Sequence, residues 1–318
     1  AHGTVTALMD GSNVEVTTLR RDVSTDGRRA TVSFAQDWRE DAARRDFTIN
    51  ALFAHPETLQ IDDYFGGVED LSAGRVRFIG DARQRIREDH LRILRYFRFQ
   101  ARFGAELDSE AEEACAELAA TLKGLSRERV GWELQNLLGL PDPSPTVMRM
   151  HQLGVLQVVL PECGRREVEA LVKLIAAEQQ HGVAPDAMRR LAALLPALPQ
   201  ITSAVTTRLR LSRNQRERLS CVAARSPDDR KNPRALAYQE GTDCAVDRLL
   251  LSGGDPTPVI DWRAPDLPIK GGEIVRRGIQ AGPSVARILR SVERRWMDED
   301  FPSEPRVTAI LDEELAKE

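Results

Sequence analysis

The first 65 residues of the chain alternate apolar and polar side chains in short runs that are rich in β-branched residues. The runs lie at 4–8, 14–19 and 61–63, and a period of two is typical of β-strands. Residues 10–13, Asp-Gly-Ser-Asn, separate the first two runs and predict a hairpin turn. Residues 22–29 are polar, include a glycine and show no periodicity, so we expect a mobile loop between strands there.

After Gly66 and Gly67 the pattern changes, and nearly all of the remaining chain is predicted to be helical. Proline, glycine and capping Asp or Ser residues separate the helical segments. The clearest breaks lie at 139–145, 226–233 and 253–268. We therefore predict an α+β protein that is predominantly helical and is built from four successive modules.

The segment around residue 90 has two chemically different faces when it is placed on a helix at 100° per residue. One face is mainly apolar and is predicted to contact the core: Ile86, His90, Ile93, Leu94, Phe97 and Ala101. The other face carries Asp89 and an arginine row, namely Arg92, Arg95, Arg98 and Arg102. This face is either a solvated surface held by pairs such as Asp89 with Arg92, or a site for a nucleoside triphosphate.

Asp89 and Arg92 together have the chemistry to select a nucleobase. Cytosine and adenine both present an exocyclic amine donor beside a ring nitrogen acceptor, so a carboxylate accepts from the first and a guanidinium donates to the second. Uracil and guanine present the opposite polarity and would leave both side chains facing mismatched groups. Arg95 and Arg98 would then face the phosphates.

Three other motifs are candidates for chemistry or for structure. Arg44, Arg45 and Asp46 precede an apolar segment, and this triplet is either a solvated helix start or a set of phosphate and ribose contacts. The segment 63–71 contains the glycine pair, which permits a sharp turn and a close backbone approach or is a plain strand-to-helix connector. The segment 126–134 begins at a helix-capping serine and is expected to be mainly structural.

Composition narrows the class of protein. The chain has 318 residues, 42% of them hydrophobic, and a net charge of -4, yet nine arginines face three acidic residues between 75 and 103. Apolar runs of membrane-spanning length are absent from the sequence, so we expect no membrane segment. The five histidines and four cysteines lack metal-ligand spacing, so we expect neither a zinc site nor a disulfide framework and favour a reducing cytoplasm.

Taken in order, the motifs resemble the bacterial and eukaryotic class of CCA-adding tRNA nucleotidyltransferases and poly(A) polymerases. The resemblance spans about 2–138 and is carried by Arg44-Arg45-Asp46-Phe47-Thr48-Ile49-Asn50-Ala51, by 63–71, by Glu88-Asp89-x-x-Arg92-x-x-Arg95-x-x-Arg98-Phe99 and by Ser126-x-Glu128-Arg129-x-x-x-Glu133-Leu134. It implies a truncated nucleotidyltransferase α/β head at 1–71, followed by an all-α neck with base recognition at 72–140, a body at 141–228 and a tRNA-binding tail at 229–318.

The resemblance also implies roles for individual residues. Arg45 and Asp46 would hold the incoming nucleotide, Asp89 and Arg92 would read its base, and Arg95 and Arg98 would bind the triphosphate. Asp63, Gly66 and Gly67 would form a motif turn. Asp26, Gly27, Arg28 and Arg29, within the expected loop, are similar to the mobile loop that lets these enzymes switch from C to A.

In this family a glycine-rich segment and an Asp-x-Asp pair, which holds two magnesium ions, lie before the strand predicted at 4–8. The chain begins after both motifs, so we expect an upstream segment to have been removed, no metal ligands of that pair within 1–318, and little catalysis by this chain alone. Glu15 lies where a third carboxylate of the fold would be. It either assists metal binding or is an ordinary solvent-facing strand residue.

The implied reaction is template-independent addition of C and A nucleotides to the 3′ end of tRNA, with Mg²⁺ as the cofactor. The expected partners are tRNA, CTP and ATP, and neither DNA nor a membrane. Two alternatives stay open: an enzyme that adds only A or only part of CCA, and a non-catalytic RNA-binding protein that has lost its metal site.

Overall fold

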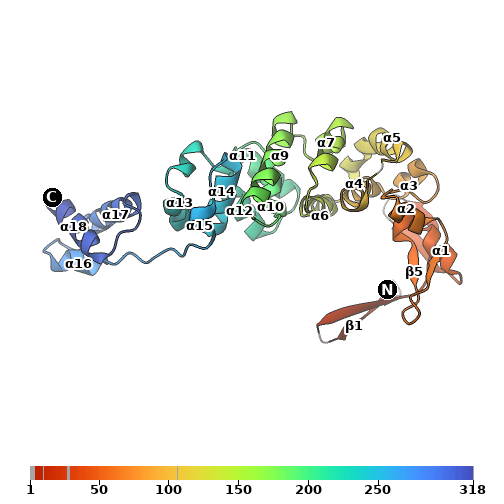
Figure 1. Cartoon of the computed structure of the whole chain (residues 1–318), viewed down its shortest axis with the longest axis horizontal. Helices are drawn as coiled ribbons and strands as arrows, with labels where there is room; N and C mark the ends of the chain where they lie inside the picture. Colours follow the sequence, from red (N-terminus) through yellow and green to blue (C-terminus); the bar gives the residue numbers. More distant parts are fainter. Residues whose placement is uncertain (1–3, 10, 27–28, 106, 318) are drawn as a thin grey trace.

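The molecule is elongated, with its strands at one end, a row of helices in the middle and a small helical unit at the other end (Figure 1). This computed structural model describes residues 4–9, 11–26, 29–105 and 107–317, with the backbone alone at 21–26 and 29–33. Three two-stranded antiparallel sheets occur in this part of the chain, and everything after residue 66 that is regular is helical. The predicted α+β class with predominant helix is confirmed.

The N-terminal hairpin forms as predicted. Strand β1 (Thr4–Met9) pairs with β2 (Ser12–Thr17), and Gly11 takes a positive φ of 82° in the turn. The two strands are exposed along their whole length, and the hairpin projects from the rest of the head (Figure 1).

The predicted mobile loop at 22–29 is largely wrong. Strand β3 (Arg20–Asp26) pairs with β4 (Arg29–Phe34), and Asp26 lies opposite Arg29 at the closed end of this second hairpin. Polar side chains do not prevent this pairing, because the ladder is made by backbone N–H and C=O groups. Gly27 and Arg28 lie outside the described residues.

The rest of the head combines short elements around a small core. Helix α1 (Trp38–Ala43) is followed by a 3₁₀ turn, η1 (Thr48–Asn50), and by strands β5 (Leu52–Ala54) and β6 (Ile61–Asp63). The strand predicted at 61–63 is therefore confirmed.

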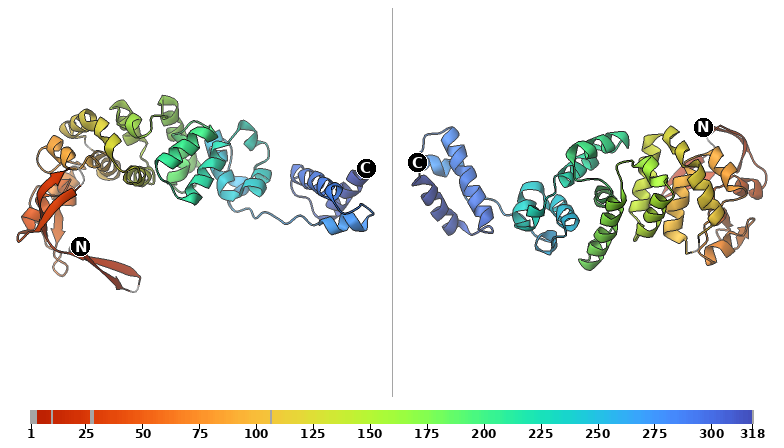
Figure 2. Two further views of the ribbon diagram at one scale, coloured as in Figure 1. Left: turned by 180° about the vertical axis from the view of Figure 1, so that it is seen from behind. Right: turned by 90° about the horizontal axis from the view of Figure 1, so that it is seen from above.

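A series of α-helices follows, with 3₁₀ turns at η2 (Ala119–Gly124) and η3 (Pro227–Arg230) (Figure 2). The α-helices are α2 (Gly67–Ser72), α3 (Ala82–Glu88), α4 (Arg92–Phe103), α5 (Ser109–Leu118), α6 (Arg127–Leu138), α7 (Ser144–Gln152), α8 (Val155–Val159), α9 (Arg165–Gln180), α10 (Ala187–Ala193), α11 (Pro199–Arg208), α12 (Arg213–Ala223), α13 (Pro233–Glu240), α14 (Thr242–Ser252), α15 (Thr257–Ile260), α16 (Gly271–Arg276), α17 (Pro283–Asp298) and α18 (Glu304–Leu315). None of the helices in the described ranges is long and apolar enough to cross a membrane.

The single helix predicted through residues 86–102 is two helices. Helix α3 ends at Glu88, Asp89 has extended backbone dihedrals, and α4 begins at Arg92. Periodicity alone did not reveal the break, because the apolar positions on both sides of it face the same core. Ile86, Ile93 and Phe97 are all buried there, as predicted.

One hydrophobic core runs from Phe47 in the head to Val259 in α15. A second core, centred on the buried Trp296 of α17, holds α16, α17 and α18 together, and Tyr238 of α13 packs against it. An extended segment before α16 joins this terminal unit to the rest of the chain (Figure 1). The four module boundaries given above stay a prediction.

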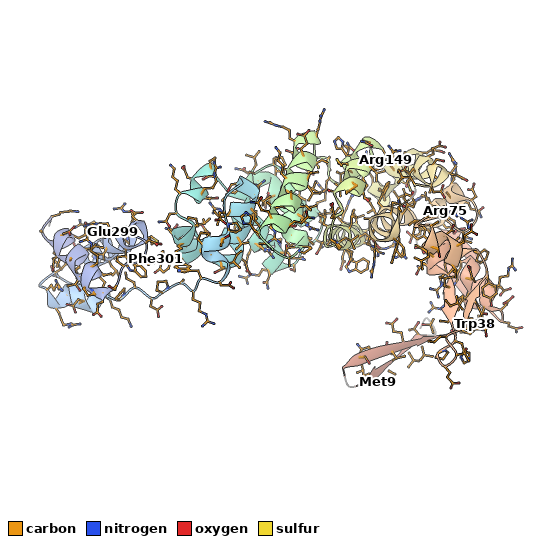
Figure 3. The ribbon with its side chains drawn as sticks, in the orientation of Figure 1. Met9, Trp38, Arg75, Arg149, Glu299 and Phe301 are labelled. Carbon is orange, nitrogen blue, oxygen red and sulfur yellow. A yellow bond between two sulfur atoms is a disulfide. The ribbon has the colours of Figure 1, made fainter. Side chains whose placement is uncertain are left out.

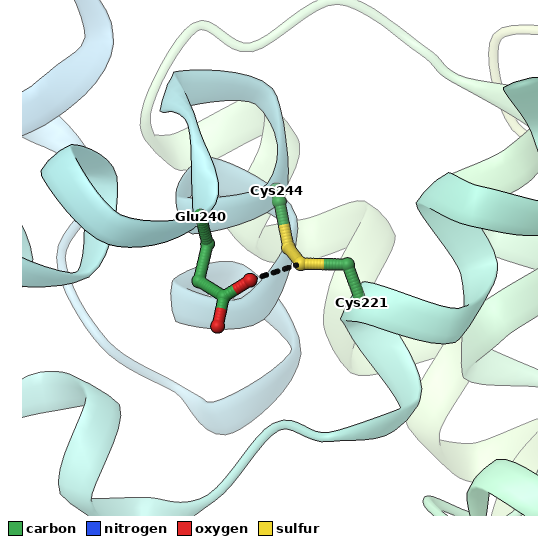
Figure 4. Close-up of side chains that lie close together, drawn as sticks. All are labelled: Cys221, Glu240 and Cys244. Atoms are coloured by element: carbon green, nitrogen blue, oxygen red, sulfur yellow. Dashed lines mark hydrogen bonds between the residues drawn. A yellow bond between two sulfur atoms is a disulfide. The ribbon is translucent and has the colours of Figure 1, made fainter.

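Two of the four cysteines correct the expectation that no disulfide forms. Cys221 of α12 is bonded to Cys244 of α14, and the carboxylate of Glu240 lies 3.4 Å from the Cys221 sulfur (Figure 4). The sequence could not predict this pair, because the two Cα atoms come within 6.3 Å of each other only when α12 packs against α14. In the described part of the chain, Cys221, Glu240 and Cys244 are also the one group spaced closely enough to hold a metal ion, but the bonded sulfurs leave no thiolate to bind one. Cys115 and Cys163 are free and buried.

Candidate functional site

A cleft of about 720 Å³ opens between the strands of the head, helix α1 and the first turns of α4 and α6. Its size is within the usual range for a small-molecule site. Charged side chains dominate its lining: Glu15, Arg20, Asp41, Arg44, Arg45, Asp46, Asp89, Arg92, Arg95 and Arg129. Among the lining residues that the structure describes, six guanidinium groups face four carboxylates, and this positive excess suits the cleft to an anion.

The cleft brings together residues that the sequence analysis singled out separately. Glu15, Arg45, Asp46, Asp89, Arg92 and Arg95 all line it. Trp38, which lies at the head end of the molecule near the base of the N-terminal hairpin, adds an aromatic wall (Figure 3). Arg98, Asp63, Gly66 and Gly67 are not among the lining residues.

Asp46 is the central anchor of the arginine row. Its Oδ1 accepts hydrogen bonds from the Phe47 backbone N–H at 3.0 Å and the Asn50 amide at 2.9 Å, and its Oδ2 accepts from Arg95 Nε at 2.5 Å. Burial raises the pKa of Asp46, but Arg95 and these hydrogen bonds outweigh it and hold the pKa below its usual value. An ionised Asp46 therefore fixes a helix α4 arginine to the head.

Asp41 is a buried carboxylate that the sequence analysis missed. It accepts from the Arg20 backbone N–H at 3.0 Å, from Arg44 Nε at 2.8 Å and from Arg45 at 3.1 Å. Burial raises the pKa of Asp41, and the hydrogen bonds from Arg20 and Arg44 outweigh it, so that its pKa is lowered. Arg44 and Arg45 follow Asp41 by three and four residues, and this spacing in the sequence could have predicted the ion pairs. Asp41 orients both guanidinium groups toward the cleft.

Glu133 was also missed, because the segment 126–134 was expected to be mainly structural. Its side chain is only 1% exposed and accepts from Arg98 Nε at 2.6 Å, while Arg95 approaches it at 3.7 Å. Arg98 also lies over the ring of Phe99, 4.9 Å from its centroid. Glu133 therefore supports the arginine row from α6, and the predicted triphosphate contact of Arg98 stays a prediction.

The proposed base-reading pair is held in place but retains hydrogen-bonding capacity. Asp89 accepts the Leu91 N–H at 3.1 Å on one oxygen and Arg129 at 2.7 Å on the other. Each carboxylate oxygen has two lone pairs, so one remains on each. Arg129 is a third residue that the sequence analysis did not assign to the site.

Arg92 is similarly anchored. Its Nη1 donates to the Arg85 carbonyl at 2.9 Å and to Glu88 at 2.5 Å, and its Nη2 donates to the Arg44 carbonyl at 3.2 Å. A guanidinium has five N–H groups, so the Nε–H and one Nη2–H remain for a ligand. The break between α3 and α4 places Asp89 and Arg92 at the mouth of the same cleft rather than along one helix face.

The glycine turn lies outside the cleft and supports the segment that enters it. Asp63 accepts the backbone N–H groups of Phe65, Gly67 and Val68, and Gly66 has a positive φ of 79°. A Cβ atom on Gly67 would lie 2.3 Å from the Thr48 carbonyl oxygen, so no larger residue fits without a shift. The turn packs α2 closely against η1.

Two segments match known protein families. Residues 1–77 match the poly A polymerase head domain, and residues 104–165 match the probable RNA and SrmB-binding site of polymerase A. The fold and the cationic cleft thus define a nucleotidyltransferase with a helical RNA-binding part.

A longer likeness identifies the family. Over 95% of its length the chain is 33% identical to the mitochondrial CCA tRNA nucleotidyltransferase 1 of Mus musculus, of which it covers 73%. The chain belongs to the family of CCA-adding tRNA nucleotidyltransferases.

Solved structures share the fold across nearly the whole chain. The Bacillus stearothermophilus CCA-adding enzyme in complex with CTP is 23% identical, with a TM-score of 0.69, and the match covers 99% of this chain and 82% of that one. The Thermotoga maritima CCA-adding enzyme complexed with tRNA is 22% identical, with a TM-score of 0.70 and coverage of 99% and 78%. The predicted resemblance is confirmed.

Proposed function

We propose that the protein adds C and A nucleotides to the 3′ end of tRNA, from CTP and ATP and without a nucleic-acid template. The observation that carries this proposal is the cationic cleft in which the carboxylate of Asp89 and the guanidinium of Arg92 stand beside Arg95. The relatives that are named for CCA addition, and the fold shared with complexes of CTP and of tRNA, support it.

In this reaction the 3′ hydroxyl of the tRNA attacks the α-phosphate of the nucleotide and pyrophosphate leaves. Arg45 and Arg95 line the cleft together with Asp46 and would neutralise the triphosphate. Asp41 and Asp46 hold these arginines ready, so little reorganisation accompanies nucleotide binding.

The free positions of the reading pair match two of the four bases. A lone pair of Asp89 can accept the exocyclic amine of cytosine or adenine, and a spare N–H of Arg92 can donate to the adjacent ring nitrogen. Uracil and guanine would place an acceptor against Asp89 and a donor against Arg92. The protein surface therefore acts as the template, and Arg129 sets the orientation of Asp89.

Nucleotidyltransferases of this family generally use divalent metal ions, and Mg²⁺ is the ion we propose. The carboxylates of the cleft do not complete such a site. Asp41, Asp46 and Asp89 are engaged by guanidinium groups, and among the described lining residues only Glu15 has a carboxylate without an arginine partner. One carboxylate does not make a two-metal site, so we propose that residues 1–318 by themselves transfer nucleotides poorly.

The test is incorporation of labelled CTP and ATP, separately and together, into tRNA lacking its CCA end. Residues 1–318 and the full-length gene product are compared in the presence of Mg²⁺ and after its removal with a chelator. We expect the full-length protein to add C, C and A and to reject UTP and GTP. Addition of A alone would support a poly(A) polymerase, and RNA binding without addition would support the non-catalytic alternative. The cytoplasmic location stays a prediction, since the mouse relative is a mitochondrial form.

A further inference from the structure

An exposed tryptophan lies on α6, three residues after Arg129, which lines the cleft. Trp132 in α6 is 58% exposed, although its neighbours Glu133 and Leu134 are buried. Among the residues that the structure describes, no aromatic ring or guanidinium packs on the indole and no acceptor receives its N–H. Exposed tryptophan side chains with a free face are typical of binding surfaces, because an indole gains most from desolvation and stacking.

We propose that Trp132 is a stacking platform for an unpaired nucleotide at the 3′ end of the RNA substrate. This inference rests on the proposed function and adds to it a residue that binds the RNA rather than the incoming nucleotide. Bases stack on aromatic side chains whatever their sequence, which suits a strand whose last nucleotide changes after every addition.

Helix geometry places Trp132 next to the base-reading pair. Arg129, which lines the cleft and donates to Asp89, precedes Trp132 by three residues. Side chains at this spacing lie on neighbouring parts of one helix face, with Cβ atoms roughly 5–6 Å apart. A nucleotide stacked on Trp132 would therefore lie at the rim of the cleft, where the growing end of the RNA must meet the incoming triphosphate.

The opposite flank of Trp132 leads to the start of α12. Gln135, three residues further along α6, accepts a hydrogen bond at 2.7 Å from Gln215 in α12. A Cβ atom on Gly131 would lie 2.9 Å from the Leu209 carbonyl, so α6 and the turn before α12 are in direct contact. Trp132 thus lies between the cleft and the first turn of α12.

The connection before α12 and the first turn of that helix are basic and exposed. Arg210 and Arg216 are both exposed, and neither has an ion-pair partner within the described part of the chain, whereas Arg213 between them pairs with Glu217. Arg210 has a positive φ of 52° because it closes the C-terminus of α11, where the Arg210 and Leu211 N–H groups donate to the last carbonyls of that helix. Two unpaired guanidinium groups beyond an exposed indole fit the phosphates of the strand that precedes the stacked nucleotide.

The test is equilibrium binding of residues 1–318 to two fluorescein-labelled RNA hairpins, one with a single unpaired 3′ nucleotide and one blunt. We expect Trp132→Ala to weaken binding of the first hairpin by about 5- to 150-fold, the range for loss of one base stack, and to leave binding of the blunt hairpin nearly unchanged. Trp132→Phe should restore most of the affinity, because a phenyl ring still stacks. Leu198→Ala, which truncates another half-exposed apolar residue, is the matched control.

The arginines give an independent readout. The double variant Arg210→Ala/Arg216→Ala should weaken binding of both hairpins alike and reduce the slope of log affinity against log salt by about 1.4–1.8. Arg166→Ala/Lys173→Ala on α9 should leave both quantities unchanged. CTP binding by Trp132→Ala should match that of the unmodified chain.

Equal affinity of the unmodified chain and Trp132→Ala for the first hairpin would overturn the stacking role while leaving the proposed function intact. Failure of the unmodified chain to bind either hairpin would overturn both. A loss of CTP binding by Trp132→Ala equal to its loss of RNA binding would mean that the residue maintains the cleft, and would also overturn the inference.

Discussion

Replacing Asp89 by asparagine tests the base-reading geometry most directly. The substitution keeps the shape of the side chain, but it removes the charge and one of the two acceptor oxygens, so that the Leu91 N–H and Arg129 can no longer each have an oxygen of their own. Arg129, which donates to Asp89 at 2.7 Å, would claim the remaining oxygen. The amide NH₂ would then face the incoming base, and it donates where the carboxylate accepted.

The size of the effect follows from the exposure of Asp89. A hydrogen bond to a charged group contributes roughly 1.5–3 kcal/mol when it is well shielded. The Asp89 side chain is 30% exposed, so water competes and we expect a loss of about 1–2 kcal/mol for CTP and ATP. The NH₂ group also gains a partner in the carbonyl oxygen of uracil or guanine. Together these changes should lower the preference for CTP over UTP by about 10- to 100-fold.

The assay is single-nucleotide incorporation by the full-length protein, with kcat/KM measured for each of the four triphosphates. Asp108→Asn, which alters the N-cap of α5 outside the cleft, is the matched control and should change no ratio. Thermal unfolding of both variants verifies that the fold is retained. An unchanged CTP to UTP ratio, or an equal loss for all four nucleotides, would refute the base-reading role of Asp89.

Three further predictions concern stability. The pKa of Asp46 is lowered in the folded protein, so the contribution of its charge to stability is present above about pH 4 and is lost as the pH falls below that value. Asp46→Asn should therefore lower the free energy of unfolding by about 2–3 kcal/mol at pH 7, measured by urea titration. An equally large loss of unfolding free energy at pH 3 would contradict this. Gly67→Ala should lower the free energy of unfolding by about 1–3 kcal/mol, because the added methyl group meets the Thr48 carbonyl. Gly124→Ala, where the methyl group has open space around it, should lower it by less than about 1 kcal/mol. Equal melting temperatures of the two variants would argue against close packing at Gly67. Cys221→Ser should lower the free energy of unfolding by about 3 kcal/mol without reductant, given the 23-residue separation of the bonded cysteines, and should leave it unchanged when reductant is present. A melting temperature of the unmodified protein that does not respond to dithiothreitol would show that the two thiols are unpaired.

Local patterns in the sequence identified the elements whose formation depends on near neighbours. The first hairpin, the strand at 61–63 and the helical character after Gly67 were predicted from periods of two and 3.6 and from turn residues. The ordered motifs also led to the correct family, because residue types at fixed spacings along the chain need no knowledge of the fold.

What the sequence left open depends on contacts between distant segments. The second hairpin was missed because residues 22–29 are polar and show no period of two, whereas the backbone groups that pair its strands do not depend on that pattern. The role of Glu133 was missed because it is defined by a partner on another element, Arg98. For Asp41 the spacing to Arg44 and Arg45 was a local signal, and only the contact with Arg20 depends on the fold.

Only the tertiary structure decided how the site is assembled. The sequence by itself determined that a carboxylate and an arginine row exist near residue 90 and that they suit a nucleotide. The fold decided that a break after α3 turns Asp89 toward Arg129, that Asp46 ties the head to α4, and that Cys221 meets Cys244. The physical reason is the range of the interactions: helix and strand formation follow from neighbours a few residues apart, whereas ion pairs, buried carboxylates and disulfides form only after packing has brought distant segments within a few ångströms.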